Sequence, residues 1–110
     1  MTLRLRSDVM VSALRRAAEG QGAFVTVVSR GHEEAGMVHV VIRQGGKASL
    51  WSEGSAADGA RGWRCRLADA EARDVDEICA QERRFDPDLW IVEVEGDVTP
   101  AILPGDLLKD

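Results

Sequence analysis

The chain of 110 residues has the length of a single domain, and its content of 45% hydrophobic and 30% charged residues excludes a disordered protein. No apolar run approaches the roughly 18 residues of a membrane-spanning helix, and the N-terminus lacks the apolar stretch of a signal peptide. The net charge of −5 disfavours nucleic acid and anionic membranes as partners. We therefore expect a small cytoplasmic domain that does not associate with membranes.

The charges are distributed unevenly along the chain. Residues 1–66 carry ten basic and six acidic side chains, whereas residues 67–110 carry four basic and thirteen acidic ones. Opposite charges in the two parts can pair inside the fold or can drive association between copies. We expect internal pairing to account for most of them.

The first regular element is a helix over residues 8–19. Apolar side chains recur there with helical spacing at Val9, Ala13 and Ala17, with Met10 and Leu14 beside them. Ser7 is expected to cap the helix, because a serine hydroxyl can accept a hydrogen bond from the first turn. Gly20 is expected to end it.

Three strands are expected next. Residues 24–29 are rich in β-branched side chains. Residues 37–43 are apolar on both faces, which predicts a strand in the middle of a sheet that is covered on both sides. The paired glycines of residues 44–47 predict a tight turn into a third strand over residues 48–53, and residues 54–62 read as a flexible connection.

A fourth strand, residues 63–67, alternates apolar and basic side chains. We expect one face to carry Trp63, Cys65 and Leu67, and the other to carry Arg64 and Arg66. Apolar surroundings raise the pKa of a thiol, so Cys65 is predicted to be structural rather than nucleophilic. With only one other cysteine, Cys79, the chain lacks both a disulfide framework and metal-ligand spacing. We expect two reduced thiols, no metal and no cofactor.

A second helix is expected over residues 74–84, capped by Asp74. Its buried stripe is formed by Val75, Ile78 and Cys79, and its last turn contains Arg83 and Arg84. Pro87 ends the helix, and residues 89–95 form a fifth strand. The predicted fold is α+β, with a mainly antiparallel five-stranded sheet and two helices in the order α-β-β-β-β-α-β.

The domain is expected to span residues 1–96, and residues 97–110 to form a C-terminal tail. Pro100 and Pro104 disfavour regular structure in this tail. Its apolar side chains, Ile102, Leu103, Leu107 and Leu108, can dock on the body of the domain or on a partner.

Three segments, residues 5–14, 34–36 and 84–93, together resemble a bacterial family known as domain of unknown function 1491, found chiefly in alphaproteobacteria. The most specific part is the run Phe85-Asp86-Pro87-Asp88-Leu89-Trp90, and the likeness spans residues 3–95. The resemblance implies an α+β fold. It implies no activity and no catalytic residue.

The segment from Arg83 to Trp90 is the strongest candidate for a ligand or partner site. Its candidate binding residues are Arg83, Arg84, Asp86, Asp88 and Trp90. Arginine side chains can hold phosphate or carboxylate groups, and aromatic rings can stack on bases. The alternative is internal: Asp86 and Asp88 bond backbone groups and the arginines, and so fix the corner between helix and strand.

The histidines and the last strand give weaker signals. His32, beside Glu33 and Glu34, is expected in a solvated loop, because it lacks the fixed ligand spacing of a metal site. His39 is expected to be a core residue hydrogen-bonded to a neighbour. Glu93 and Glu95 are expected to form cross-strand ion pairs with Arg64 and Arg66.

Two functions fit these features. The first is a non-catalytic binding or protein-interaction domain that acts as a homodimer or with another protein, and it is favoured by the lack of a convergent catalytic set. The second is a binder of a small anionic ligand or nucleotide through Arg83 and Arg84. A hydrolase that uses His39 or His32 with Glu93 is the weakest hypothesis, so no catalytic residue is assigned.

Overall fold

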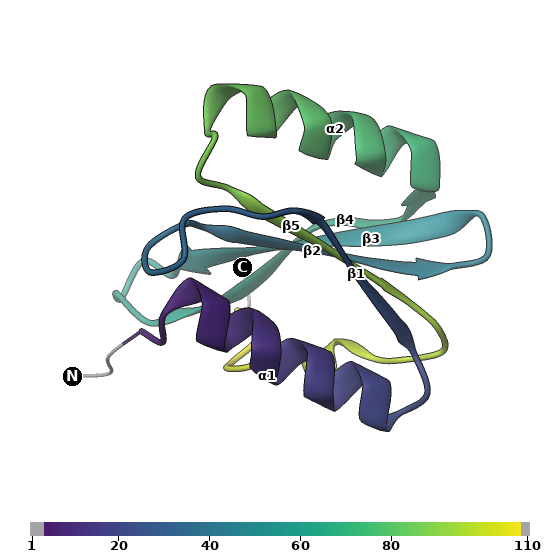
Figure 1. Ribbon diagram of the computed structural model, residues 1–110, viewed down its shortest axis with the longest axis horizontal. Helices are drawn as coiled ribbons and strands as arrows, with labels where there is room; N and C mark the ends of the chain where they lie inside the picture. The colour runs from purple at the N-terminus through teal and green to yellow at the C-terminus, as the bar shows by residue number, and fades with distance from the viewer. Residues whose placement is uncertain (1–3, 109–110) are drawn as a thin grey trace.

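The computed structural model describes residues 4–108, which form two helices on opposite faces of one sheet (Figure 1). In chain order the elements are α1 (Ser7–Gly20), β1 (Phe24–Ser29), β2 (Val38–Gln44), β3 (Lys47–Ser55), β4 (Arg61–Glu71), α2 (Ala72–Phe85), β5 (Trp90–Glu95) and a short 3-10 helix, η1 (Pro100–Ile102). The predicted α+β class and the order of helices and strands are confirmed.

The strands lie in the order β1-β5-β2-β3-β4, so β1 and β4 are the edges. β2 and β5 run parallel, and the other neighbouring pairs are antiparallel. β2 is central, as predicted from its two apolar faces: the consecutive residues Val40 and Val41 point to opposite faces, and both are buried. The predicted tight turn is also confirmed, with Gly45 at a φ of +65° between β2 and β3.

The strand order overturns the expected ion pairs of β5. Glu93 and Glu95 cannot face Arg64 and Arg66, because β2 and β3 separate β5 from β4. Glu93 instead pairs with Arg43 of β2 at 3.1 Å. Internal pairing of the uneven charge is still observed, since basic residues of the first part of the chain contact acidic residues of the second: Arg43 with Glu93, Lys47 with Glu71 and Arg66 with Glu82.

α1 differs from its prediction at its start and in its buried stripe. Ser7 does not cap the helix; it is the first helical residue, and its buried hydroxyl donates a hydrogen bond to the carbonyl of Gly36. The buried stripe is centred on Met10, Leu14 and Ala18, one residue on from the predicted one, and Val9 is 46% exposed. The apolar spacing permits both stripes, so contact with the sheet decides between them.

α2 begins two residues before its predicted start. Its N-cap position is Glu71, and Asp74, which was expected to cap the helix, lies in the first turn, where a negative charge still favours the helix dipole. Val75 and Cys79 are buried as predicted. Arg83 and Arg84 occupy the last turn, as expected.

β4 contains a bulge that changes which side chains share a face. The pairing with β3 shifts between Leu50–Leu67 and Trp51–Cys65, which leaves one extra residue in β4. Trp63 is buried on the α1 side of the sheet and Leu67 packs on the α2 side, while Cys65 is exposed. The prediction of one shared apolar face was therefore wrong for Leu67, which the bulge moves to the other side of the sheet. Cys65 stays in regular register with Trp63, but it is exposed rather than buried.

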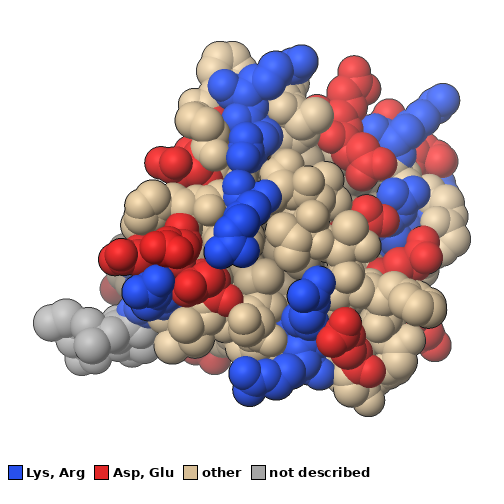
Figure 2. All heavy atoms as spheres, viewed as in Figure 1, with Lys and Arg blue, Asp and Glu red and all other residues tan. Residues whose placement is uncertain are grey.

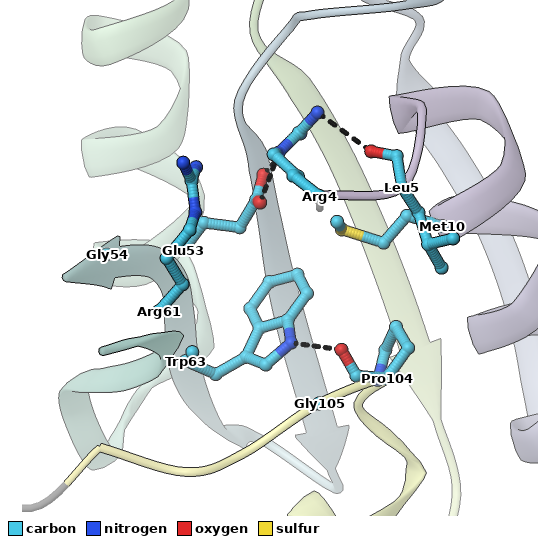
Figure 3. A pocket seen from close by; sticks show the side chains of 10 residues that line it. Arg4, Leu5, Met10, Glu53, Gly54, Arg61, Trp63, Pro104 and Gly105 are labelled. Atoms are coloured by element: carbon cyan, nitrogen blue, oxygen red, sulfur yellow. Dashed lines mark hydrogen bonds and ion pairs between the residues drawn. The ribbon is translucent and has the colours of Figure 1, made fainter. Parts of the chain in front are cut away.

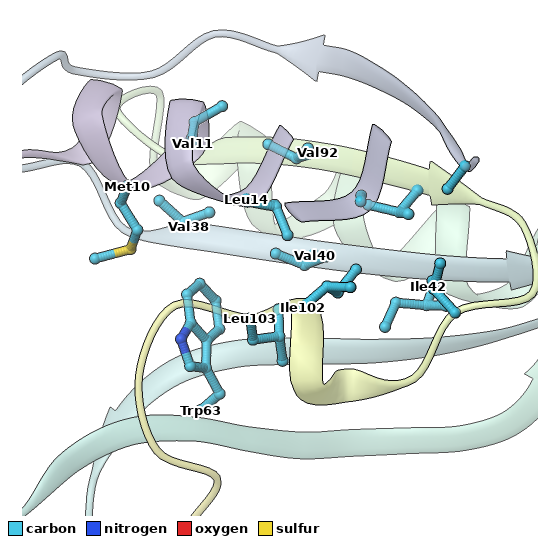
Figure 4. Close-up of a cluster of buried hydrophobic side chains, with 14 of the residues drawn as sticks. Met10, Val11, Leu14, Val38, Val40, Ile42, Trp63, Val92, Ile102 and Leu103 are labelled. Atoms are coloured by element: carbon cyan, nitrogen blue, oxygen red, sulfur yellow. The ribbon is translucent and has the colours of Figure 1, made fainter. Parts of the chain in front are cut away.

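Two hydrophobic cores fill the spaces between the layers. The α1-side core, shown in Figure 4, contains the inward side chains of α1, β2 and β5 together with Trp63. The α2-side core contains Val41, Leu50, Val75, Cys79 and Ile91. The C-terminal segment belongs to the first of these cores, since Val98, Ile102 and Leu103 are buried in it. Figure 4 shows Ile102 and Leu103 in this core. Among residues 4–108, neither helix is long and apolar enough to cross a membrane.

Candidate functional site

The corner that follows α2 contains all five predicted binding residues, and Arg83 holds it together. Its guanidinium donates hydrogen bonds to the carbonyl of Leu89 at 2.9 Å and to the carbonyl of Arg30 at 3.0 Å. Backbone carbonyl groups therefore accept hydrogen bonds from the Arg83 guanidinium that was expected to bind a ligand. Arg83 joins the end of α2 to the end of β1.

Asp86 and Asp88 shape the same corner through the backbone. The Asp86 carboxylate accepts a hydrogen bond from the Asp88 N–H at 3.1 Å, the pattern of an Asx turn. The carbonyl of Asp88 accepts from the N–H of His32 at 3.0 Å. Gly31 and Gly36 permit this approach, because a Cβ at either position would come within 2.1 Å of the Asp88 carbonyl oxygen. Asp86 thus fixes the corner between helix and strand, as the alternative to ligand binding predicted. Its partner is a backbone N–H rather than an arginine.

Trp90 and Arg84 occupy opposite environments. The buried Trp90 ring donates its N–H to the carbonyl of His32 at 2.8 Å and lies under the Arg30 guanidinium, 5.0 Å from the ring centroid. Arg84 and Phe85 are exposed to solvent. The predicted binding residues therefore share a corner but do not converge on one cavity, and their role in ligand or partner binding stays a prediction.

A second polar cluster lies between α2 and the sheet, around Glu82, which the sequence analysis did not single out. Arg66 donates two hydrogen bonds to the Glu82 carboxylate, at 2.7 and 2.6 Å, and the Nε2 atom of His39 lies 2.7 Å from the same group. The Arg66 guanidinium, aided by His39, lowers the pKa of Glu82 to about 2. His39 is buried and bonded to a neighbour, as expected, and its carboxylate partner is not Glu93.

Neither cysteine has the surroundings of a nucleophile. Burial raises the pKa of Cys79 to about 11, with the nearby Glu82 and Asp76 carboxylates acting in the same direction. Cys65 is exposed, yet partial desolvation raises the pKa of its thiol also. Arg66, which follows Cys65 in the chain, is engaged by Glu82.

The loop around His32 is exposed, as expected. The Nδ1 atom of His32 accepts hydrogen bonds from the N–H groups of Glu34 and Ala35, both at 3.2 Å. Within residues 4–108, no three side chains of the histidine, cysteine, aspartate or glutamate type gather as metal ligands would.

A hollow that the sequence analysis missed lies between the start of α1, the β3–β4 hairpin and the C-terminal segment (Figure 3). Its volume is about 310 Å³, and its walls include Leu5, Met10, Glu53, Trp63 and Pro104. The Trp63 indole N–H donates to the Pro104 carbonyl at 3.0 Å, which fixes the C-terminal segment along one wall. These residues come from four separate parts of the chain, so no local sequence motif predicts the hollow.

Comparisons with known proteins place this structure among close structural relatives. Residues 5–103 match a family model described as a protein of unknown function (DUF1491). A crystal structure of a DUF1491 family protein from Caulobacter crescentus is 36% identical over 96% of this chain and 100% of that one, with a TM-score of 0.85.

Two solution structures are similar as well. An NMR structure of a DUF1491 family protein from Caulobacter crescentus is 34% identical over 98% of this chain and 100% of that one, with a TM-score of 0.83. Protein Atu0922 from A. tumefaciens is 34% identical over 92% of this chain and 93% of its own, with a TM-score of 0.80. No curated protein matches the chain.

Proposed function

Because the chain belongs to the family described as protein of unknown function (DUF1491), whose description names no activity, we propose a function from the surface of the molecule. The chain is a small non-catalytic interaction domain of the bacterial cytosol, and it pairs with a second copy of itself along the edge strand β1. The observation that carries this proposal is an edge strand that contains no charged residue and no proline and pairs with no described segment on its outer side.

β1 is an edge strand with the sequence Phe-Val-Thr-Val-Val-Ser, which contains no charged residue and no proline. Edge strands of soluble proteins are usually protected by charges, prolines or a covering segment, because their free N–H and C=O groups invite pairing. The one protective feature of β1 is an irregular register between Val27 and Ser29 at its end, because a bulge turns an edge strand away from a partner. We infer that a strand of a partner pairs with this edge.

The opposite edge is different. β4 carries charged side chains along its length, at Arg61, Arg64, Arg66, Asp69 and Glu71. Its backbone is also occupied at Trp63, whose N–H donates to the Asp106 carbonyl and whose carbonyl accepts from the Leu108 N–H, both at 2.8 Å. The C-terminal segment thus pairs with β4 at Trp63, whereas no segment within residues 4–108 pairs with the outer side of β1, which is the edge left for a partner.

The face of β1 on the α2 side is apolar and open. Phe24 is 75% exposed and Val28 is 54% exposed, because the α2-side core includes no residue of β1. Between β1 and α2 lies a groove of about 340 Å³ whose walls include Val28, Cys79 and Ile91. Pairing along β1 would remove part of this apolar surface from water, which favours association.

The charges at the two ends of β1 support a second copy as the occupant. Arg30 follows the last residue of β1, and Arg83 is hydrogen-bonded to its carbonyl. At the other end, Phe24 is opposite Glu95 of β5. If two copies of β1 pair in antiparallel fashion, the twofold axis sets the basic end of each strand beside the acidic end of the other.

Figure 2 shows one face of the molecule with its charged side chains. On the face that it shows, basic side chains form a column that starts over α2 and continues towards α1, and a broad area of uncharged side chains lies beside it. An acidic peptide would pair its charges only with the basic end of β1, whereas a second copy of the chain places opposite charges beside both ends.

Sedimentation equilibrium of the full chain tests the proposal. We expect a concentration-dependent mass that rises to twice the 12.0 kDa of one chain. Thr26→Lys places a charge on the exposed face of β1 and should shift the equilibrium to the monomer. Gln81→Lys adds the same charge on the exposed side of α2 and should leave the equilibrium unchanged. A monomer at all concentrations, or equal effects of the two variants, would overturn the proposal.

A further inference from the structure

The hollow beside Trp63 has the features of a binding site for a small molecule, and it is independent of the β1 edge. We propose that it binds a small monocarboxylate with an apolar body, such as a medium-chain fatty acid. The carboxylate is held by Arg61 at the mouth, and the apolar body lies against Leu5, Met10 and Trp63.

The walls favour an apolar body. Met10 projects from the first turn of α1 and Trp63 from β4, and Pro104 lies beside the Trp63 ring (Figure 3). Leu5, at the edge of the hollow, is 49% exposed although it is a large hydrophobic side chain. The volume of about 310 Å³ is at the small end of the range of about 300 to 1,000 Å³ that ligand pockets occupy. An apolar ligand in this place would cover surface that water now contacts.

Arg4 and Glu53 form one polar wall, and their bonding capacity is already used. The Arg4 guanidinium donates to Glu53, to the Ser7 hydroxyl at 3.0 Å and to the Gly36 carbonyl at 3.0 Å. Glu53 also accepts from the N–H of Val38 at 2.9 Å. This pair therefore shapes the hollow without offering a free charge to a ligand.

Arg61 offers that charge. It lines the same hollow, it is exposed, and among residues 4–108 its guanidinium has no carboxylate partner (Figure 3). A guanidinium binds a carboxylate with two parallel hydrogen bonds. Among the described residues that line the hollow, Arg61 is the one cation whose charge is not already paired, and Glu53 is nearby. This charge matches one negative charge and disfavours a doubly charged phosphate. The ligand class is therefore a monocarboxylate.

Binding here and pairing along β1 involve opposite edges of the sheet, because the hollow is built on β3 and β4. The two proposals can therefore fail separately. Sedimentation reports on β1, and a ligand titration reports on the hollow.

The test is a titration of the ¹⁵N-labelled full chain with octanoate below its micellar concentration and with 1-octanol below its solubility limit. We expect saturable shifts with octanoate at the Trp63 indole N–H and at the amides of Leu5, Met10 and Gly105, which all line the hollow. Octanol should give shifts at the same residues with weaker affinity. No shift there with octanoate, or shifts centred on Arg84 and Trp90 instead, would overturn the proposal.

Variants of Arg61 separate the charge from the apolar contacts. Arg61→Gln should weaken the binding of octanoate by about two- to fivefold and leave the binding of octanol unchanged, since one exposed ion pair is lost. Arg61→Lys should retain most of the affinity. The matched control is Arg73→Gln, which removes a charge from an exposed side chain of α2 and should change neither affinity. Equal affinity for octanoate in Arg61→Gln and in the unchanged chain would refute the assignment of Arg61.

Discussion

Arg4 and Glu53, 49 positions apart in the sequence, form an ion pair in which two guanidinium nitrogens each lie 2.8 Å from a carboxylate oxygen. The side chains are 17% and 7% exposed. The pair joins the segment before α1 to β3, and Ser7 and Gly36 complete it with hydrogen bonds to the same guanidinium. One ion pair therefore fixes the start of α1, the loop before β2 and one wall of the hollow.

Breaking this ion pair should be costly. We expect Glu53→Gln to lower the free energy of unfolding by about 2 to 4 kcal/mol, because it leaves a mostly buried guanidinium without its counter-charge. Glu77→Gln, at an exposed position of α2, should change stability by less than about 0.5 kcal/mol. Urea unfolding of both variants makes the comparison. Equal stabilities would show that the Arg4–Glu53 contact is not maintained in solution.

The Glu82 cluster should make stability depend on pH in a defined direction. The pKa of Glu82 is lowered to about 2 from an ordinary value of 4.5, so ionised Glu82 stabilises the fold above pH 4.5. This contribution should disappear as the pH falls from about 4.5 to about 2.

The test compares urea unfolding of the unchanged chain and Glu82→Gln across this pH range. The difference in free energy of unfolding should be about 1 kcal/mol at neutral pH, a value that allows for the partial exposure of Glu82, and should shrink on acidification. A difference that stays constant with pH would contradict the proposed role of the Arg66–Glu82 contact.

The two thiols should react at different stages. Cys65 is exposed and Cys79 is buried with a pKa of about 11, so iodoacetamide should label only Cys65 in the folded chain. Since the pKa of Cys65 is raised, its labelling should be no faster than that of glutathione at the same pH. Peptide mass spectrometry with time measures both rates. Faster labelling of Cys65 than of glutathione would indicate an activated thiol, against this account.

Charge reversal should test the geometry of pairing along β1. Arg30→Glu and Glu95→Arg should each weaken the dimer, because each brings like charges together across the twofold axis. The double variant should recover part of the lost affinity, since it exchanges the two charges. Sedimentation measures the dissociation constants, and thermal unfolding checks that the loss of the Arg30–Trp90 contact has not unfolded the chain. Additive weakening in the double variant would exclude antiparallel pairing.

Gly36 should be intolerant of a side chain. A Cβ there would lie 2.1 Å from the Asp88 carbonyl oxygen and 2.9 Å from backbone atoms of His32, so the loop would have to move away from the corner. We expect Gly36→Ala to lower the free energy of unfolding by about 2 kcal/mol or more. Gly46→Ala is the control, because nothing lies within 4 Å of a Cβ at that position. Equal stability of the two variants would show that the loop adapts.

Several features of the fold followed from local spacing alone. The apolar faces of β2 predicted its central place, the stripe of Val75 and Cys79 predicted the buried side of α2, and the glycines at 45 and 46 predicted the hairpin. Each of these depends on the repeat of a helix or strand, or on a turn that only certain residues permit, and both are properties of neighbouring residues.

Partners across the fold could not be predicted in this way. The insertion of β5 between β1 and β2 decides that Glu93 contacts Arg43, and the bulge in β4 decides that Leu67 packs on the opposite side of the sheet from Trp63. The predicted buried stripe of α1 differs by one residue from the observed one, because two apolar stripes fit its sequence and only contact with the sheet decides which of them is buried.

The sequence by itself thus determined which segments become helices and strands, and in what order, because these choices depend on periodicity within about ten residues. Only the tertiary structure decided that β1 is an open edge, that Glu82 joins His39 to Arg66, and that Arg61 lines a hollow together with Trp63. The physical reason is that these relations come from pairing between segments far apart in the chain, and their free energy depends on the whole packed arrangement.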